Sequence, residues 1–309
     1  MQKQIQTETR IPVKLSDLVT KQPEDVYREV ERLCQMMFVQ PDLGFMSRVF
    51  EDVLNLFAGK YPGYRECNTR FHDLGHTLDC YLALARLLHG ASVEGRVFSQ
   101  RQVLLALITS LFHDTGYIQK MDEPEGTGGQ YTLVHVDRSI QFMSRYLSEK
   151  DLPGAEIDFC AACLQCTGLN VRLDKVIFVS RDHEILGKMV GTADLLGQMA
   201  GRTYLERLVF LFHEFDEAGV PGFESEMDLL LKTTSFYEMT QKRFADQLEG
   251  VNRWSRPHFR ARWNIDEDLY QEAITRNMNY LESVLALHGE RYRPHFRREG
   301  LLKDQGGRP

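Results

Sequence analysis

Apolar residues recur at the spacing of an α-helix along nearly the whole chain. In residues 45–57, for example, Phe45, Val49, Val53 and Phe57 fall on one face, as residues three or four apart on a helix do. The same periodicity predicts helices at residues 26–38, 45–57, 70–88, 100–114, 134–147, 155–166, 184–199, 205–215, 224–248 and 266–287. We therefore expect an all-α fold.

The predicted helix at residues 100–114 differs from the others because it is apolar almost all round. A helix without a polar face is buried on every side, so this one is expected at the centre of the protein. Strand signals are scarce, and residues 176–179 form the one convincing β-type run. No internal repeat or low-complexity tract interrupts the helical pattern.

The pattern divides the chain into four predicted parts. Residues 1–22 form an N-terminal tail, and residues 23–200 form a core that holds most of the candidate chemistry. Residues 201–290 form a helical extension packed on this core. Residues 291–309 are basic, polar and glycine-containing, so we expect a flexible tail there.

Two polar stretches interrupt the helices. Residues 119–130 form a glycine-rich acidic loop after the apolar helix, and two interpretations are open: a flap that gates a neighbouring site, or a simple connector. Residues 253–263 interleave arginines with aromatic residues. We expect a solvated loop there that holds the C-terminal helix, with a nucleotide contact as the alternative.

Composition and charge exclude several classes of protein. The chain is 43% hydrophobic and 26% charged, as globular proteins are, and its net charge of −7 disfavours general nucleic-acid binding. The first twenty residues lack the apolar segment of a secretory signal, and no run of about 18 apolar residues could span a membrane. The six cysteines lie in helix-like segments, so reduced thiols and a cytoplasmic location are expected.

Histidines and aspartates stand out in three distant segments. His72 and His76 are four residues apart and would share one face of the predicted helix. His113 and Asp114 are adjacent at the end of the apolar helix, and Asp194 is the one acid in an apolar stretch. Each feature alone has an ordinary explanation: a surface histidine pair, a helix-terminal cap, or a solvated acid.

A divalent metal ion would explain these features together. Imidazole and carboxylate ligands suit a borderline or hard ion such as Mn, Fe, Zn or Mg. A carboxylate buried without a partner is costly, so a buried Asp194 needs a proton, a hydrogen bond or a cation. An uncoordinated histidine next to a metal, as His72 would be beside His76, is suited to donate a proton to a leaving oxygen.

The order of these elements resembles that of the HD superfamily of metal-dependent phosphohydrolases. The matching segments read RFHDLGH at residues 70–76, LFHDTGY at residues 111–117 and TADL at residues 192–195. The first segment also resembles the signature of cyclic nucleotide phosphodiesterases, with Asp73 where those carry asparagine. The resemblance covers about residues 60–200.

Within the superfamily, the sequence is most similar to small bacterial predicted HD phosphohydrolases. In these, a polar motif ending in serine follows the His-Asp pair, and a threonine precedes the last aspartate. Here HVDRS at residues 135–139 and Thr167 occupy those places.

The resemblance implies an HD-domain helical bundle with a C-terminal helical extension. It implies that His76, His113, Asp114 and Asp194 are the metal ligands. It also implies that His72 is the general acid.

One departure from the family pattern concerns a second metal ion. HD proteins with two metals usually add two histidines between the His-Asp pair and the last aspartate. His135 is a candidate for one, and near the place of the other only Thr167 and Asn170 occur. One metal site is therefore expected, a second is left open, and His135 and Thr167 are candidates to contact the metal ligands, a second ion or the substrate. Arg207 is a candidate phosphate contact, with a solvated helix face as the alternative.

Together these inferences predict a metal-dependent phosphohydrolase or phosphodiesterase. Its substrate is expected to be a small phosphoester, in particular a nucleotide or cyclic nucleotide, attacked by metal-activated water while His72 protonates the departing oxygen. The alternative is a non-catalytic sensor that keeps the metal or nucleotide pocket. No membrane partner is expected, nucleic acid is disfavoured, and a homo-oligomer is left open.

Overall fold

The computed structural model describes residues 13–20 and 22–302. Within these residues the protein is all-helical, as the apolar periodicity predicts, and no strand is present. The α-helices are α1 (Pro23–Met37), α2 (Gly44–Phe57), α3 (Leu74–Val93), α4 (Gln100–Phe112), α5 (His135–Ser148), α6 (Gly154–Gln165), α7 (Arg181–Ala200), α8 (Tyr204–Glu217), α9 (Glu226–Asp246), α10 (Ser255–Trp263) and α11 (Leu269–His288). Short 3₁₀ helices accompany them, including η1 (Leu15–Asp17), η2 (Thr115–Tyr117) and η3 (Gly128–Tyr131).

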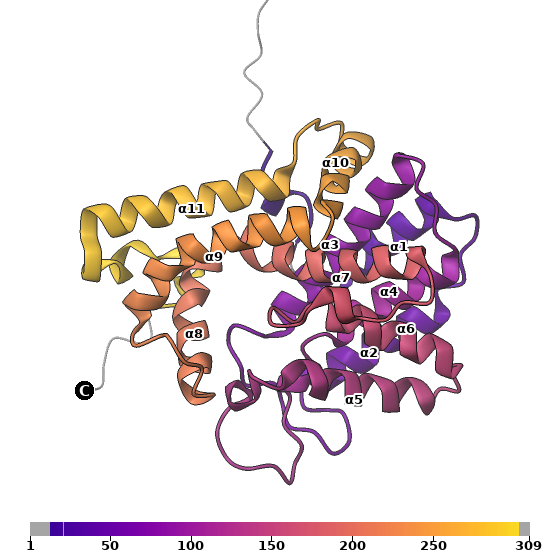
Figure 1. The fold of residues 1–309 in the computed structure, drawn as a ribbon, viewed down its shortest axis with the longest axis horizontal. Coiled ribbons are helices and arrows are strands. Elements are labelled where there is room, and N and C mark those ends of the chain that lie inside the picture. Colours follow the sequence, from indigo (N-terminus) through magenta and orange to yellow (C-terminus); the bar gives the residue numbers. More distant parts are fainter. Residues whose placement is uncertain (1–12, 21, 303–309) are drawn as a thin grey trace, which may run out of the picture.

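Helices α3, α4 and α7 form the centre of the protein (Figure 1). In α4 every residue from 103 to 112 is buried, which confirms the central position expected from its apolar character. Helix α7 packs closely along α3. A β-carbon on Gly197 would lie 2.8 Å from the backbone nitrogen of Cys80, so this approach requires a residue without a side chain.

The remaining helices lie on two sides of this centre (Figure 1). Helices α1, α2, α5 and α6 occupy one side, and α8, α9 and α11 occupy the other. Helix α11 packs against α7 and α9, and α8 packs against α9 and η3. The segment before α5 and the helices after α7 are therefore neighbours, although they are far apart in the sequence.

Residues 253–263 are not the solvated loop expected from their charges. They complete a 3₁₀ turn and form α10, which packs against α3 and buries His258 and Phe259. Pro257 lies in the first turn of α10, where a missing backbone N–H costs nothing. In the sequence the arginines alternate with the aromatic residues that α10 buries. The apolar face of this helix is therefore hard to recognise from the sequence.

The C-terminal segment also differs from the prediction. Residues 291–302 do not form a free tail, because Tyr292 and Phe296 are buried in the core cluster. The Tyr292 hydroxyl donates a hydrogen bond to the Glu226 carboxylate on α9, which fixes this segment to the extension. The rest of the predicted tails, residues 1–12, 21 and 303–309, lies outside the described residues.

The β-type run at residues 176–179 forms no strand, and Ile177 and Val179 are almost fully exposed. Among the helices of the described residues, none combines the length and apolar composition that a bilayer span requires.

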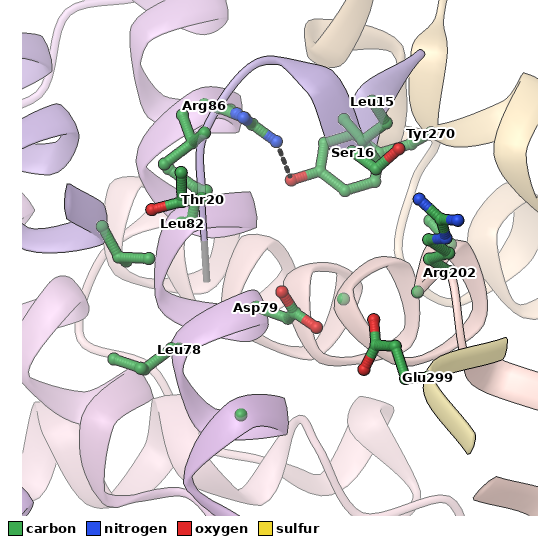
Figure 2. A pocket seen from close by; sticks show the side chains of 16 residues that line it. Leu15, Ser16, Thr20, Leu78, Asp79, Leu82, Arg86, Arg202, Tyr270 and Glu299 are labelled. Carbon is green, nitrogen blue, oxygen red and sulfur yellow. Dashed lines mark hydrogen bonds between the residues drawn. The ribbon is translucent and has the colours of Figure 1, made fainter. Parts of the chain in front are cut away.

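A cavity of about 180 Å³ lies between η1, α3, α7 and the start of α11 (Figure 2). The buried Arg86 on α3 donates a hydrogen bond of 3.0 Å to the Tyr270 hydroxyl on α11. Its guanidinium also lies 5.6 Å from the ring centres of Phe259 and Tyr270, a favourable distance for a cation and an aromatic ring. Arg86 thus ties the central helix to α10 and α11.

Candidate metal centre

His76 lies in the first turn of α3, where the sequence starts the helix with a capping aspartate. The Asp73 carboxylate accepts a hydrogen bond of 2.9 Å from the His76 backbone N–H, as aspartate at an N-cap does. Arg207 of α8 donates to the same carboxylate at 2.7 Å. These contacts hold the start of α3, and therefore the His76 side chain, in a fixed position.

His113 and Asp114 follow the last residue of α4. The helix ends at this point, so adjacent side chains that would diverge by about 100° along a helix can both turn toward one point. The His113 Nδ1 atom donates to the Ser110 carbonyl oxygen at 2.8 Å, which leaves Nε2 free to act as a ligand.

The turn after Asp114 is held by the polar motif of α5. The Gly116 N–H donates to the Ser139 hydroxyl at 2.8 Å, and the Arg138 Nε donates to the Gly116 carbonyl oxygen at 2.7 Å. A β-carbon on Gly116 would lie 2.0 Å from the His135 carbonyl oxygen, so this close contact requires glycine. Ser139 therefore acts on the backbone beside the His-Asp pair.

Asp194 on α7 lies next to both histidines. Its Oδ1 lies 3.0 Å from His76 Nε2 and 3.6 Å from His113 Nε2. On the other carboxylate, Asp114 Oδ2 lies 3.3 Å from His76 Nε2 and 3.1 Å from His113 Nε2. The two imidazole nitrogens are 3.2 Å apart. The structure thus brings together the four residues that the resemblance implied.

These distances fit a divalent ion. A first-row metal bonded to nitrogen and oxygen at about 2.0–2.2 Å holds neighbouring ligand atoms about 3.0–3.5 Å apart. His76, His113 and Asp114 are buried, and together they form a group that could hold a metal ion. The buried Asp114 Oδ2 atom lies beside His76 and His113 but makes no hydrogen bond, which is costly unless a cation satisfies it.

The charges of the group are strongly coupled. Burial alone would lower the pKa of His113, but the Asp114 carboxylate raises it well above its ordinary value. Burial would likewise raise the pKa of Asp114, and His113 holds it well below its usual range. The pair with His113 therefore favours the ionised form of Asp114.

His72 lies close to this group but not on the helix. The sequence predicted a helix from about residue 70, with His72 and His76 on one face, and this prediction is wrong because α3 begins at Leu74. His72 precedes the capping residue, in a bend. The rings of His72 and His76 are nevertheless 6.0 Å apart, centre to centre, so His72 remains beside the metal centre.

Glu214 of α8 holds His72. Its Oε2 lies 2.6 Å from His72 Nδ1, and its Oε1 accepts hydrogen bonds from the backbone N–H groups of Arg70 and Phe71, at 3.0 and 2.8 Å. Both side chains are largely buried, with 14% and 5% of their surfaces exposed. Burial opposes the charged imidazole, but Glu214 outweighs it and raises the pKa of His72 above its ordinary value.

Two further rings stack in series beside His72. The Tyr117 ring stacks on His72 with centres 4.3 Å apart, and His135 stacks on Tyr117 at 4.6 Å. His135 Nδ1 donates to the Thr132 carbonyl oxygen at 2.6 Å, and burial lowers its pKa. The group that could hold a metal ion consists of His76, His113 and Asp114, so the roles of Asp194 and His135 as ligands stay predictions.

A cavity of about 610 Å³ opens onto these residues. His72, Asp114, His135, Thr167 and Asp194 all line it. The Thr167 hydroxyl donates to the Leu164 carbonyl oxygen at 2.9 Å. Residues from α8 and α9 line the cavity as well, so the C-terminal helices form part of the site.

Arg207 and the glycine-rich loop do not line this cavity. The Arg207 guanidinium donates to Asp73 and to the Phe71 carbonyl oxygen, so we assign it a positioning role in place of the predicted phosphate contact. In the loop at residues 119–130, Thr127 binds Glu217 through its backbone N–H and its hydroxyl. These contacts favour a connector fixed to α8 over a gate.

Glu214 and Tyr117 are the residues that sequence reasoning missed. Tyr117 follows the His-Asp pair closely in the sequence, and this proximity was a usable signal. Glu214 is 142 residues from His72 and lies in an aromatic helix that reads as core. No local pattern links it to the site.

Comparison with known proteins gives one partial match. A family model described as Npun_R2479-like matches residues 121–252, which is less than half of the chain. The matched part contains His135 and Asp194 but not the two segments that carry His72, His76 and the His-Asp pair. No curated protein matches the chain. No solved structure matches it either.

Proposed function

We propose that this protein is a metal-dependent phosphohydrolase of the HD type that cleaves a small phosphoester. The observation that carries the proposal is the convergence of His76, His113, Asp114 and Asp194 within 3.0–3.6 Å contacts, next to a histidine that a glutamate holds. The resemblance of the three sequence segments to HD phosphohydrolases supports the same conclusion.

The four side chains would hold one divalent ion as two imidazole and two carboxylate ligands. When bound, such an ion supplies a Lewis acid that makes water a nucleophile near neutral pH and offsets charge on the phosphoryl oxygens. His113 presents Nε2 to the ion because its Nδ1 donates to Ser110. His76, His113 and Asp114 are buried, and Asp194 also lines the cavity from which substrate and water would reach the ion.

His72 would supply the proton to the leaving oxygen. Its ring faces the cavity, and Glu214 stabilises the protonated imidazole through the contact at Nδ1. Nε2 is then the atom that can donate. Glu214 raises the pKa of His72 and so favours the imidazolium, which is the form that a general acid needs.

The test is a screen of phosphomonoesters and phosphodiesters with added Mn²⁺, Fe²⁺, Zn²⁺ or Mg²⁺, together with metal analysis. Asp114→Asn should lose bound metal and lower kcat more than about 100-fold, since even residues behind metal ligands contribute about 10- to 100-fold. Asp158→Asn, at an exposed position on α6, is the matched control and should behave as the native protein does.

Two outcomes would count against the proposal. Turnover that survives in Asp114→Asn would mean that the reaction does not use this group. Bound metal without turnover of any phosphoester would favour the sensor alternative. His72→Asn separates the roles further, because it should retain metal while losing roughly the 100- to 10,000-fold that a general acid contributes.

A further inference from the structure

We propose that the cavity at the metal centre selects a phosphoester with one phosphoryl group and a large apolar alcohol, either aromatic or a hydrocarbon chain. The inference rests on the proposed hydrolase function and specifies its substrate. Three features of the cavity carry it: its walls, its charges and its rim.

The walls are mostly aliphatic and aromatic. They come largely from α8, from α9 and from the connection between these helices, and include Leu208, Leu211, Phe215, Phe223, Leu229 and Phe236. The volume of about 610 Å³ lies within the usual range for sites that enclose an organic molecule and far exceeds the space that a phosphoryl group needs. Most of the occupant would therefore contact apolar side chains.

The charges disfavour a polyphosphate. Lys232 is the one lysine or arginine among the described residues that line the cavity, whereas three aspartates line it. Lys232 is already engaged, because its Nζ donates to Asp228 and to the Gly222 carbonyl oxygen at 2.7 Å each. Proteins hold phosphate groups with arginine forks or lysines. The metal would bind one phosphoryl group, but the cavity offers no unengaged lysine or arginine for further phosphate groups.

The rim of the cavity is apolar too. Leu133, Val134 and Leu169 line it and are 61%, 47% and 45% exposed. Large apolar side chains that gather around an opening at this exposure mark a surface that binds apolar groups. Leu133 and Val134 precede α5 and Leu169 follows α6, so the rim is formed from two sides.

This substrate class departs from the nucleotide expected from the sequence. In the reaction, a water oxygen bonds to phosphorus, the bond from phosphorus to the alcohol oxygen breaks, and the His72 proton passes to the alcohol oxygen. The proton that the water loses returns to His72, so the net change is the addition of one water across the broken bond. The apolar alcohol leaves toward the walls formed by α8 and α9. The residues around the metal would bind the phosphate, and the apolar wall residues would determine which size of alcohol fits.

The experiment compares kinetics across matched substrates with the Mn²⁺-loaded full chain. Butyl, hexyl and octyl phosphate, kept below micelle formation, test the hydrocarbon arm, and 2-naphthyl phosphate tests the aromatic arm. Glycerol phosphate, ATP and cyclic AMP are the polar comparisons. KM should fall roughly fourfold for each CH₂ added, or about 200-fold from butyl to octyl, since each buried CH₂ strengthens binding by that factor.

A variant links the selectivity to the wall. Phe236→Ala should raise KM for octyl or naphthyl phosphate about tenfold or more, as loss of a buried aromatic contact does, and leave butyl phosphate nearly unchanged. Leu231→Ala is the matched control, because Leu231 is on the same helix, exposed and outside the cavity. Equal effects on short and long substrates would contradict a wall contact.

Binding without turnover separates this inference from the hydrolase proposal. Octylphosphonate should bind the metal-loaded protein much more tightly than methylphosphonate in calorimetry, with a negative heat-capacity change. If the phosphonates show this order but no phosphoester is cleaved, the hydrolase proposal fails and apolar recognition stands. If ATP, cyclic AMP or glycerol phosphate is preferred, the hydrolase proposal stands and apolar selection is overturned.

Discussion

At the scale of single residues, Glu214 connects the backbone around His72 to the imidazole itself. One carboxylate oxygen contacts the ring, and the other accepts two backbone N–H groups of the preceding residues. A carboxylate used in this way fixes both the tautomer and the direction of the histidine. We therefore regard Glu214 as a positioning residue that acts through His72.

The change Glu214→Gln should lower kcat about tenfold or more while leaving KM and bound metal unchanged. The amide keeps the size of the side chain but no longer stabilises the imidazolium, so part of the roughly 100- to 10,000-fold contribution of a general acid is lost. Steady-state kinetics and metal analysis check both quantities.

Glu217→Gln is the control, since Glu217 lies on the same helix and binds Thr127 rather than His72. A similar loss of kcat in both variants would show that the effect comes from the stability of α8 and not from His72.

At the scale of elements, the contact between α3 and α10 contains a buried histidine pair. His89 Nδ1 and His258 Nδ1 are 3.2 Å apart, and both rings are buried. Burial, and then the charge of Arg262, lowers the pKa of His89 to about 4. Burial, with Arg86 and His89, lowers the pKa of His258 to about 2. Both histidines are therefore neutral in the folded protein near pH 7.

The free energy of unfolding should fall as the pH drops from about 6.5 toward 4. In this window the unfolded chain binds protons on both histidines, near their ordinary pKa of about 6.5, while the folded protein does not. The contribution of the neutral histidines to stability is thus fully present above pH 6.5. Below that pH the free energy of unfolding decreases by up to roughly 1.4 kcal/mol per pH unit for each histidine. Urea unfolding at several pH values measures the slope.

The double change His89→Gln and His258→Gln should lower stability at pH 7 but flatten this slope. His213→Gln, at a half-exposed position on α8, should keep it. An unchanged slope in the double variant would mean that other groups dominate the acid sensitivity of the protein.

At the scale of the whole molecule, the proposed metal ligands link helices that are distant in sequence. His76 lies on α3, the His-Asp pair follows α4, and Asp194 lies on α7. An ion bound here would cross-link the centre of the fold, and a ligand that binds only the folded state stabilises it.

Added Mn²⁺ or Zn²⁺ should therefore raise Tm, and a chelator should reverse the rise. At a concentration about 100 times Kd the gain is about 2.7 kcal/mol. Differential scanning fluorimetry across a metal titration measures it. Asp114→Asn should show little shift, Asp158→Asn should show the full shift, and equal shifts in both would place the ion elsewhere.

The sequence by itself determined the helical class and the central position of α4, because both depend on a periodicity that is legible within single segments. Its resemblance to HD phosphohydrolases implied the four residues that the structure brings together at the candidate metal centre. The tertiary structure decided where α3 begins, that residues 255–263 are helical, that Glu214 holds His72, and that α8 and α9 wall the cavity. These features depend on contacts between segments that are far apart in the chain. Such contacts are set by the shapes of side chains and by close backbone approach at glycines. The periodicity of apolar residues does not encode either of them.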